Sequence, residues 1–245
     1  MRSILLASIV LTLLAPAGRA DDATDIVDKA VRAMATSDLR LNRLATAVRV
    51  ERGSFFPPSG EMPCERTVSI SPPDRVRYDA TITIGRERQS MVMALNGLLS
   101  WQKAGGKIED LSLGQSDIMK NGDIDSWALT TLLPLRQRGI KLKALSKAAD
   151  DKPAVGVNVA RSDRPDAQVY FDAKTGLPAK VAVKTRYGDL EVSRVVDLAE
   201  FKDFDGIKLP TRITVSENGR KIEEWTVQNY RFPDKLDEKL FAKPK

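Results

Sequence analysis

The chain has 245 residues, of which 42% are hydrophobic and 29% charged, and its formal net charge at pH 7 is +6. This composition is typical of a folded protein, because disordered chains lack the apolar surface that offsets the entropy lost on ordering. The sequence holds no histidine and a single cysteine, Cys64. Ser-His-Asp triads, Cys-His pairs, histidine-ligated metals and internal disulfides are therefore excluded, and we expect no catalytic residues, no metal and no cofactor.

The first twenty residues have the layout of a secretory signal peptide. Arg2 gives a positive start, residues 4–14 form an apolar run, and Gly18 and Ala20 supply the small residues before a cleavage site. The run is too short to span a membrane, which takes ~20 residues. We expect cleavage after Ala20 and a soluble periplasmic protein; the alternative is a buried N-terminal helix.

The positive charges are interspersed along the chain rather than clustered. No basic block or aromatic-basic platform appears, so we expect no nucleic-acid partner. A weak attraction to anionic membrane surfaces, giving peripheral contact, is the most that this charge supports.

An amphipathic helix is expected over residues 25–35. Apolar residues recur there at three- and four-residue spacing, and Thr24 can cap the start. The apolar residues are Ile26, Val27, Ala30, Val31 and Met34.

From residue 45 onward, apolar residues alternate with polar ones. Such alternation is typical of an antiparallel sheet with one buried and one wet face. Asn96-Gly97 and Asn218-Gly219 are strong signals of two-residue hairpins, because both residue types tolerate positive φ. We expect about ten strands in a meander, forming one α+β domain over residues 21–245.

Residues 115–138 interrupt the alternation with an apolar stretch that Asn121-Gly122 and Pro134 divide. We expect two short helices here, the second beginning near residues 123–126. The segment carries more apolar residues than one narrow stripe needs, so its predicted partner is the concave, apolar face of the sheet.

Carboxylates gather in three places: Asp110, Asp117, Asp123 and Asp125; Asp203 and Asp205; and Glu223 and Glu224. No pair stands out as a glycosidase site, and Asp123-Ile124-Asp125 lacks the Gly and Glu that a calcium loop requires. We interpret the three groups as solvent-exposed; catalysis by one of them is the alternative.

Three stretches carry a resemblance to a known family. They are Val-Tyr-Phe-Asp-Ala-Lys-Thr-Gly-Leu-Pro at 169–178, Phe-Lys-Asp-Phe-Asp-Gly-Ile-Lys-Leu-Pro at 201–210 and the ending Leu-Asp-Glu-Lys-Leu-Phe at 236–241. With the exported helix, the meander and the helical insert, they resemble the fold of the periplasmic lipoprotein carriers LolA and LolB and related outer-membrane lipoprotein-sorting proteins. The likeness covers nearly the whole mature chain. It implies a curved antiparallel half-barrel around an apolar cavity, closed by helices.

The resemblance also implies which residues line this cavity and which close it. The implied lid residues are Trp127, Leu132 and Leu133, and the implied cavity residues are Met91, Met93, Leu95, Trp101, Val181, Val183, Ile213, Val215, Trp225 and Val227. The alternative is that these residues pack against the helices and leave no cavity. Arg40 or Arg43 stands where the carriers have the arginine that latches the lid, whereas the hairpin residues 52–62 exceed the usual length of the carriers.

Members of this family shield the acyl chains of lipoproteins that cross the periplasm. We therefore expect a monomeric, non-enzymatic carrier that binds the acyl chains of a lipid or lipoprotein, with lipoprotein sorting to the outer membrane as the process it serves. The alternative is an envelope sensor or protein-interaction module of the same fold, which would bind a partner protein through its lid and sheet edge.

Overall fold

The computed structural model describes residues 20–145, 154–162, 164–187 and 189–244. Within these ranges, thirteen strands form one antiparallel sheet in the order β6-β5-β4-β3-β2-β1-β13-β12-β11-β10-β9-β8-β7. Strands that follow one another in the sequence are neighbours in the sheet, except β6 and β7, which form its two edges. At the centre of the sheet, the first strand pairs with the last. The strands are β1 (Ala47–Phe55), β2 (Met62–Ser71), β3 (Arg75–Ile84), β4 (Glu87–Asn96), β5 (Leu99–Ala104), β6 (Lys107–Asp110), β7 (Lys141–Ala144), β8 (Ala154–Ala160), β9 (Ala167–Asp172), β10 (Pro178–Tyr187), β11 (Leu190–Phe204), β12 (Ile207–Glu217) and β13 (Arg220–Arg231).

The expected class, a curved antiparallel sheet with helices, is confirmed, but the expected count of about ten strands is too low. The edge strands β6 and β7 have only four residues each, too few to show an alternating pattern in the sequence. The hairpin predicted at Asn218-Gly219 is present, with φ of 48° and 80° at the two residues. Both values belong to the left-handed region that a two-residue hairpin turn requires.

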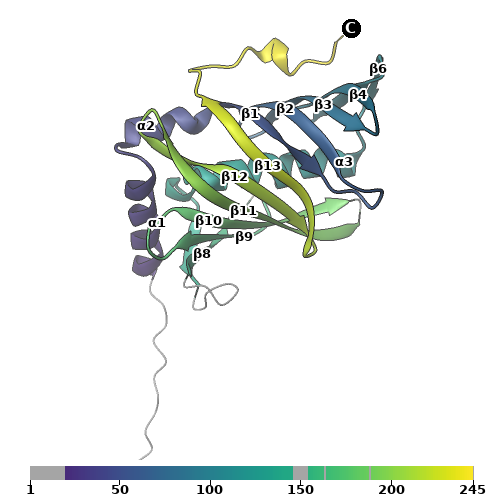
Figure 1. Cartoon of the computed structure of the whole chain (residues 1–245). Helices are drawn as coiled ribbons and strands as arrows, with labels where there is room; N and C mark the ends of the chain where they lie inside the picture. The colour runs from purple at the N-terminus through teal and green to yellow at the C-terminus, as the bar shows by residue number, and fades with distance from the viewer. Residues whose placement is uncertain (1–19, 146–153, 163, 188, 245) are drawn as a thin grey trace, which may run out of the picture.

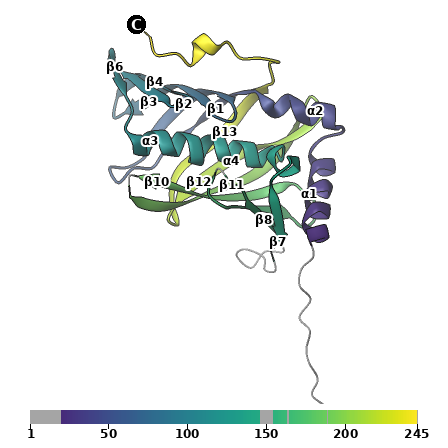
Figure 2. The same cartoon turned by 180° about the vertical axis from the view of Figure 1, so that it is seen from behind.

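The sheet curls around a helical segment (Figure 1). In the view from behind, this segment runs between one half of the sheet, β1 to β4, and the other half, β10 to β12 (Figure 2). The segment consists of α3 (Leu113–Asp117), the π-helix η2 (Ile118–Ile124), α4 (Asp125–Thr130) and the 3₁₀ turn η3 (Pro134–Arg136). We call residues 113–136 the inner segment.

The inner segment begins at a capping box, in which Ser112 and Gln115 satisfy each other's backbone N–H groups. The break expected at Asn121-Gly122 is wrong, because the chain passes through these residues as a π-helix. A Cβ atom at Gly122 would lie 3.1 Å from Cδ of Arg194, so the glycine gives that side chain room to pack against the helix. The helical path ends at Leu132, which has a φ of +62°.

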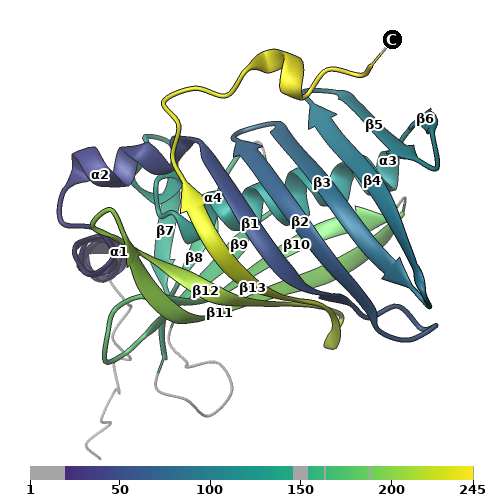
Figure 3. The ribbon, with the colours of Figure 1, turned by 45° about the horizontal axis from the view of Figure 1, so that its top comes forward.

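The N-terminal helix α1 (Ala20–Met34) starts earlier than expected and packs against β7, β8 and β12. It is followed by α2 (Asp38–Asn42) and the 3₁₀ turn η1 (Arg43–Ala45), at the same end of the sheet (Figure 3). Four residues of the predicted stripe are buried in α1, together with Ala23, while Ile26 is half-buried; the buried residues are Ala23, Val27, Ala30, Val31 and Met34.

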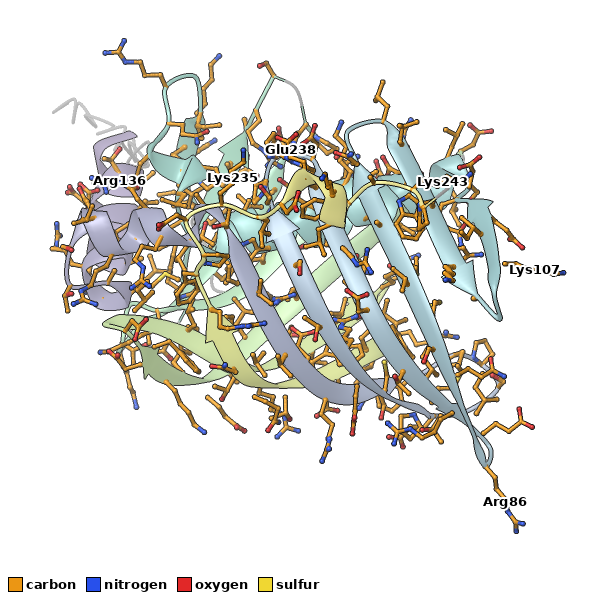
Figure 4. All side chains as sticks on the ribbon, turned by 90° about the horizontal axis from the view of Figure 1, so that it is seen from above. Arg86, Lys107, Arg136, Lys235, Glu238 and Lys243 are labelled. Atoms are coloured by element: carbon orange, nitrogen blue, oxygen red, sulfur yellow. The ribbon has the colours of Figure 1, made fainter. Side chains whose placement is uncertain are left out.

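The C-terminal segment, residues 233–244, crosses the outer face of the sheet and contains the 3₁₀ turn η4 (Glu238–Leu240) (Figure 3). Lys235, Glu238 and Lys243 are spaced along it in the view from above (Figure 4). Lys243 reaches Asp110 at the end of β6, with Nζ 2.7 Å from Oδ1. The segment therefore spans the strands from β13 to the β6 edge.

Within the described ranges, no helix has the length and apolar character needed to cross a membrane. The signal peptide proposed from the sequence lies, apart from Ala20, outside the described residues.

Candidate functional site

The concave face of the sheet, where it meets the inner segment, is the candidate site. Nine of the ten cavity residues expected from the sequence lie on this face by strand register, and all of them except the half-buried Met91 and Met93 are buried. Met93 pairs with Tyr78, Val183 with Arg194 and Ile213 with Trp225. Each pair places two side chains on the same face of the sheet.

Trp101 is the exception, and its assignment to the cavity is wrong. The β4–β5 register pairs Trp101 with Ala94 and Ser100 with Leu95, so Trp101 has the opposite orientation to Met93 and Leu95. Its Nε1 donates to the carbonyl of Phe241, 3.0 Å away in the C-terminal segment. Trp101 therefore lies on the outer face.

The three residues assigned to a lid belong to the inner segment and its end. Trp127 and Leu132 are buried and Leu133 is half-buried. The Trp127 ring stacks on Tyr230 with centroids 6.1 Å apart, and the Arg49 guanidinium lies 5.1 Å from the Trp127 ring centroid. The inner segment thus fills much of the concave face.

Between the inner segment and the sheet lies a buried network of charges, which we call the charge network: Arg49, Glu51, Arg66, Asp123, Arg194, Glu217 and Glu223. Arg194 binds three carboxylates, with N–O distances of 2.6 Å to Asp123, 2.7 Å to Glu217 and 3.2 Å to Glu223. Arg66 binds two, at 2.7 Å from Glu51 and 3.3 Å from Glu223. Two neutral donors also bind carboxylates of the charge network: Tyr78 donates to Asp123 and Trp225 donates to Glu223, both at 2.7 Å.

Burial and pairing shift the titration of this network in opposite directions. For Asp123, burial raises the pKa above its ordinary value, and the pairing with Arg194 offsets this only in part. For Glu223, burial also acts to raise the pKa, but Arg66 and Arg194 together lower it below the ordinary value. Burial raises the pKa of Tyr78 far above its usual range, so this hydroxyl stays protonated and donates.

The sequence interpretation of the carboxylates is wrong for Asp125 and Glu223, which are buried, and for Asp123, which is half-buried and paired with Arg194. It is confirmed for Asp110, Asp203 and Asp205, which are exposed. The missed arginines had a sequence signal. Arg66 stands between the inward residues Cys64 and Val68, and Arg194 between Val192 and Val196, so each interrupts an otherwise apolar run of alternate positions.

Arg40 and Arg43 do not reach the inner segment through any contact within the described chain. Both bind the β11–β12 turn, where Arg40 donates to the carbonyl of Asp205 and Arg43 lies 3.4 Å from its carboxylate. Arg40 and Arg43 reach this turn because α2 and η1, which carry them, lie beside the turn (Figure 3). The arginines that bind the inner segment are Arg194 from β11, and Arg161 and Arg164 from the β8–β9 loop.

Two cavities lined by described residues lie on the concave face. A cavity of about 40 Å³ between Trp127, Arg49 and Arg194 is too small for an acyl chain. A second cavity of about 180 Å³, the methionine pocket, lies between the strands β1 to β4, β13 and the start of the inner segment. Its apolar lining consists of Phe55, Ala80, Met91, Met93, Ile118 and Met119. Ligand pockets usually measure about 300–1,000 Å³, so the methionine pocket is small for a lipid.

No protein-family model matches the sequence, and no curated protein matches it. Solved structures do match. A LolA superfamily protein from Nitrosomonas europaea aligns with a TM-score of 0.57 at 17% identity, over 90% of this chain and 97% of that one. A domain named for outer membrane lipoprotein sorting from Vibrio parahaemolyticus aligns with a TM-score of 0.54 at 12% identity, over 92% and 98%.

A DUF1329 family protein from Desulfovibrio piger aligns with a TM-score of 0.53 at 11% identity, over 90% of this chain and 97% of that one. All three alignments span nearly the full length of both chains, while the sequences have diverged almost completely. The resemblance seen in the sequence is confirmed at the level of the fold: this chain has the LolA-like fold.

Proposed function

We propose that this protein is a non-enzymatic periplasmic carrier that binds the acyl chain of a lipid or lipoprotein against the concave face of its sheet. The observation that carries the proposal is the inner segment, which occupies that face and leaves the methionine pocket at its N-terminal end. An acyl chain enters this pocket and lengthens it by displacing α3 and η2 from the sheet.

The contacts of the inner segment support such a displacement. Its apolar side chains Met119, Ile124 and Trp127 cover the concave face as a ligand would. Its polar anchors, by contrast, are salt bridges and hydrogen bonds to Arg194, Tyr78 and the end of β10. Groups of this kind regain hydrogen bonds to water when they separate, so opening costs less than it would across a fully apolar interface.

The free energy gained by burying an acyl chain is large enough to offset the opening of the inner segment. Each methylene removed from water contributes about 0.8 kcal/mol, so a chain of about fifteen methylenes contributes roughly 12 kcal/mol before the cost of opening. The flexible side chains of Met91, Met93 and Met119 adapt to a chain of irregular shape.

A reversible cross-link between α3 and β5 tests the proposal. The Oγ atoms of Ser100 and Ser116 lie 2.5 Å apart, so the pair Ser100→Cys and Ser116→Cys places two thiols within bonding reach. Burial raises the pKa of the native Cys64 thiol to about 11, which leaves it a poor competitor for the new pair.

We expect the oxidised variant to lose binding of a fluorescent fatty-acyl ester, a neutral probe without a carboxylate, and to regain it when dithiothreitol opens the bond. The matched control is Arg52→Cys with Glu65→Cys, which joins two paired, exposed positions of β1 and β2. Binding by that control should be the same in both redox states. If the locked inner segment binds as well as the reduced one, or if neither state binds, the carrier proposal fails; the second result is the one that the interaction-module alternative predicts.

A further inference from the structure

A third cavity, of about 350 Å³, shares no lining residue with the methionine pocket or with the cavity beside Trp127. Its walls come from the end of η1, the β2–β3 turn, the inner segment from Ile124 onward and the β8–β9 loop. Two arginines of that loop, Arg161 and Arg164, line it together with Asp125. We call it the arginine pocket.

The charges in the arginine pocket do not balance. Asp125 accepts two hydrogen bonds from Arg161, one of them 2.7 Å long from Nη2 to Oδ2. Nη1 of Arg164 lies 3.7 Å from the same carboxylate. The side chains of Arg161 and Asp125 are each 5% exposed, and that of Arg164 is 10% exposed. One buried carboxylate therefore serves two buried guanidinium groups, and one positive charge of the pocket lining is left without a partner among the described residues.

Some N–H groups of the two guanidinium groups have no acceptor among the described residues. Each carries five N–H groups. Hydrogen bonds within the described chain use three of those on Arg161, to Asp125 and the carbonyl of Pro165, and two on Arg164, to the carbonyls of Lys120 and Pro73. Nε of Arg161 is buried and has no partner among the described residues. Buried charged donors without partners are costly, and an oxyanion satisfies both the charge and the N–H groups.

The rest of the lining is mostly apolar. Besides the polar Thr131 and Gln137, it comprises Leu44, Ala45, Pro72, Pro73, Ile124, Ala128, Leu133, Pro134 and Ile140. At Gln137 and Ile140 the pocket adjoins a second hollow of about 500 Å³, beside Val27 of α1. The side chains of Gln137 and Ile140 therefore border both hollows.

We propose that the arginine pocket binds an amphiphile with an oxyanion head group, a carboxylate or a phosphate ester. The head group binds Arg161 and Arg164, and the apolar tail lies along Leu44, Ile124 and Ile140. A volume of about 350 Å³ falls within the usual range for ligand pockets. Because the lining is separate, this site does not depend on acyl-chain binding in the methionine pocket.

Isothermal titration calorimetry with five probes tests the chemistry: octanoate, octyl phosphate, the neutral octanol, and the tailless anions acetate and inorganic phosphate. Octanoate and octyl phosphate should bind at least about tenfold more tightly than the other three, because only they satisfy both the arginines and the apolar wall. Octanol binding as tightly as octanoate would overturn the role of the arginines. Inorganic phosphate or acetate binding as tightly as its octyl counterpart would overturn the role of the tail.

Variants locate the binding. Arg164→Gln removes the second guanidinium and leaves the Arg161–Asp125 pair intact, and we expect it to weaken octanoate binding about tenfold. Ala128→Leu adds three carbon atoms to the wall of the arginine pocket and should reduce octanoate binding to a similar extent.

The matched control is Ala80→Leu, the same change in the methionine pocket. It should leave octanoate binding unchanged and weaken only the binding of the neutral fluorescent ester of the carrier test. Circular dichroism confirms that each variant is folded. Loss of octanoate binding in Ala80→Leu with none in Ala128→Leu would assign the anion to the methionine pocket and refute the proposal.

Discussion

Glu223 is the carboxylate that both central arginines of the charge network share. It is buried in β13 and accepts hydrogen bonds from Arg66, Arg194 and Trp225. Burial acts to raise its pKa, but the two arginines outweigh burial and lower the pKa below the ordinary value of 4.5. A carboxyl group whose pKa is lower in the folded state stabilises the protein above its unfolded pKa, and this stabilisation is lost as the pH falls through the folded pKa.

Replacing Glu223 by glutamine should therefore have a pH-dependent cost. At pH 7 we expect the free energy of unfolding to fall by about 2 kcal/mol, because charge-assisted hydrogen bonds to two buried arginines are weakened. The difference from the wild-type protein should shrink as the pH falls below 4.5, where the carboxyl group of the unfolded chain takes up a proton, and should disappear below the lowered pKa of the folded state. Urea unfolding at pH 7 and at several lower values measures this difference. The control Glu224→Gln changes a more exposed neighbour and should cost less than about 1 kcal/mol. A Glu223→Gln cost that is the same at every pH would contradict the assignment.

At the scale of the element, the inner segment is held to the sheet by three aspartates. Asp123 binds Arg194 and Asp125 binds Arg161. Near the N-terminal end, Asp117 accepts from Oγ1 of Thr185 at 2.9 Å and from the backbone N of Arg186 at 2.7 Å. Of the three aspartates, Asp117 is therefore the first to release in an opening that starts at α3.

Substitution of Asp117 by alanine should loosen α3 without unfolding the sheet. The change removes two inter-element hydrogen bonds, which corresponds to about 1–3 kcal/mol of local stability and to an amide exchange rate at least about fivefold higher. Hydrogen–deuterium exchange measured by mass spectrometry should show faster exchange in residues 113–124 and unchanged exchange in β11 to β13. The matched control is Asp110→Ala, which changes an exposed aspartate that binds Lys243 of the C-terminal segment. Equal exchange in the two variants would show that Asp117 does not anchor the segment.

At the scale of the whole molecule, the alternation of apolar residues was sufficient to predict an antiparallel sheet, because the period of two is a direct consequence of strand geometry. It also identified most of the residues on the concave face. Alternation did not predict the charge network. It assigns polar residues to the wet face of the sheet, whereas Arg66 and Arg194 occupy inward positions. Inward arginines are stable only with partners from distant strands and from the inner segment, which a local pattern does not contain.

Trp101 illustrates a second limit of the sequence. The residue follows a run of inward positions, but the side to which it points depends on the register across the β4–β5 turn. A shift of one residue in such a turn reverses every side chain of the strand that follows. The residue that covers Trp101, Phe241, lies 140 positions away in the sequence, so no local pattern connects the two.

The outer face that Trp101 and Phe241 share yields a last prediction, which separates stability from binding. Phe241 is fully buried, its carbonyl accepts from Trp101, and the neighbouring carbonyl of Leu240 accepts from Arg77 at 2.7 Å. Removal of the ring in Phe241→Ala should cost about 3–5 kcal/mol of unfolding free energy, because the C-terminal segment then leaves a cavity over β3 to β5. The control Lys239→Ala changes an exposed residue of the same segment and should cost less than about 0.5 kcal/mol. Because this face lies opposite the methionine pocket, the folded fraction of Phe241→Ala should bind the neutral fluorescent ester of the carrier test as the wild-type protein does. A loss of that affinity without a loss of stability would place the acyl chain under the C-terminal segment instead of under the inner segment.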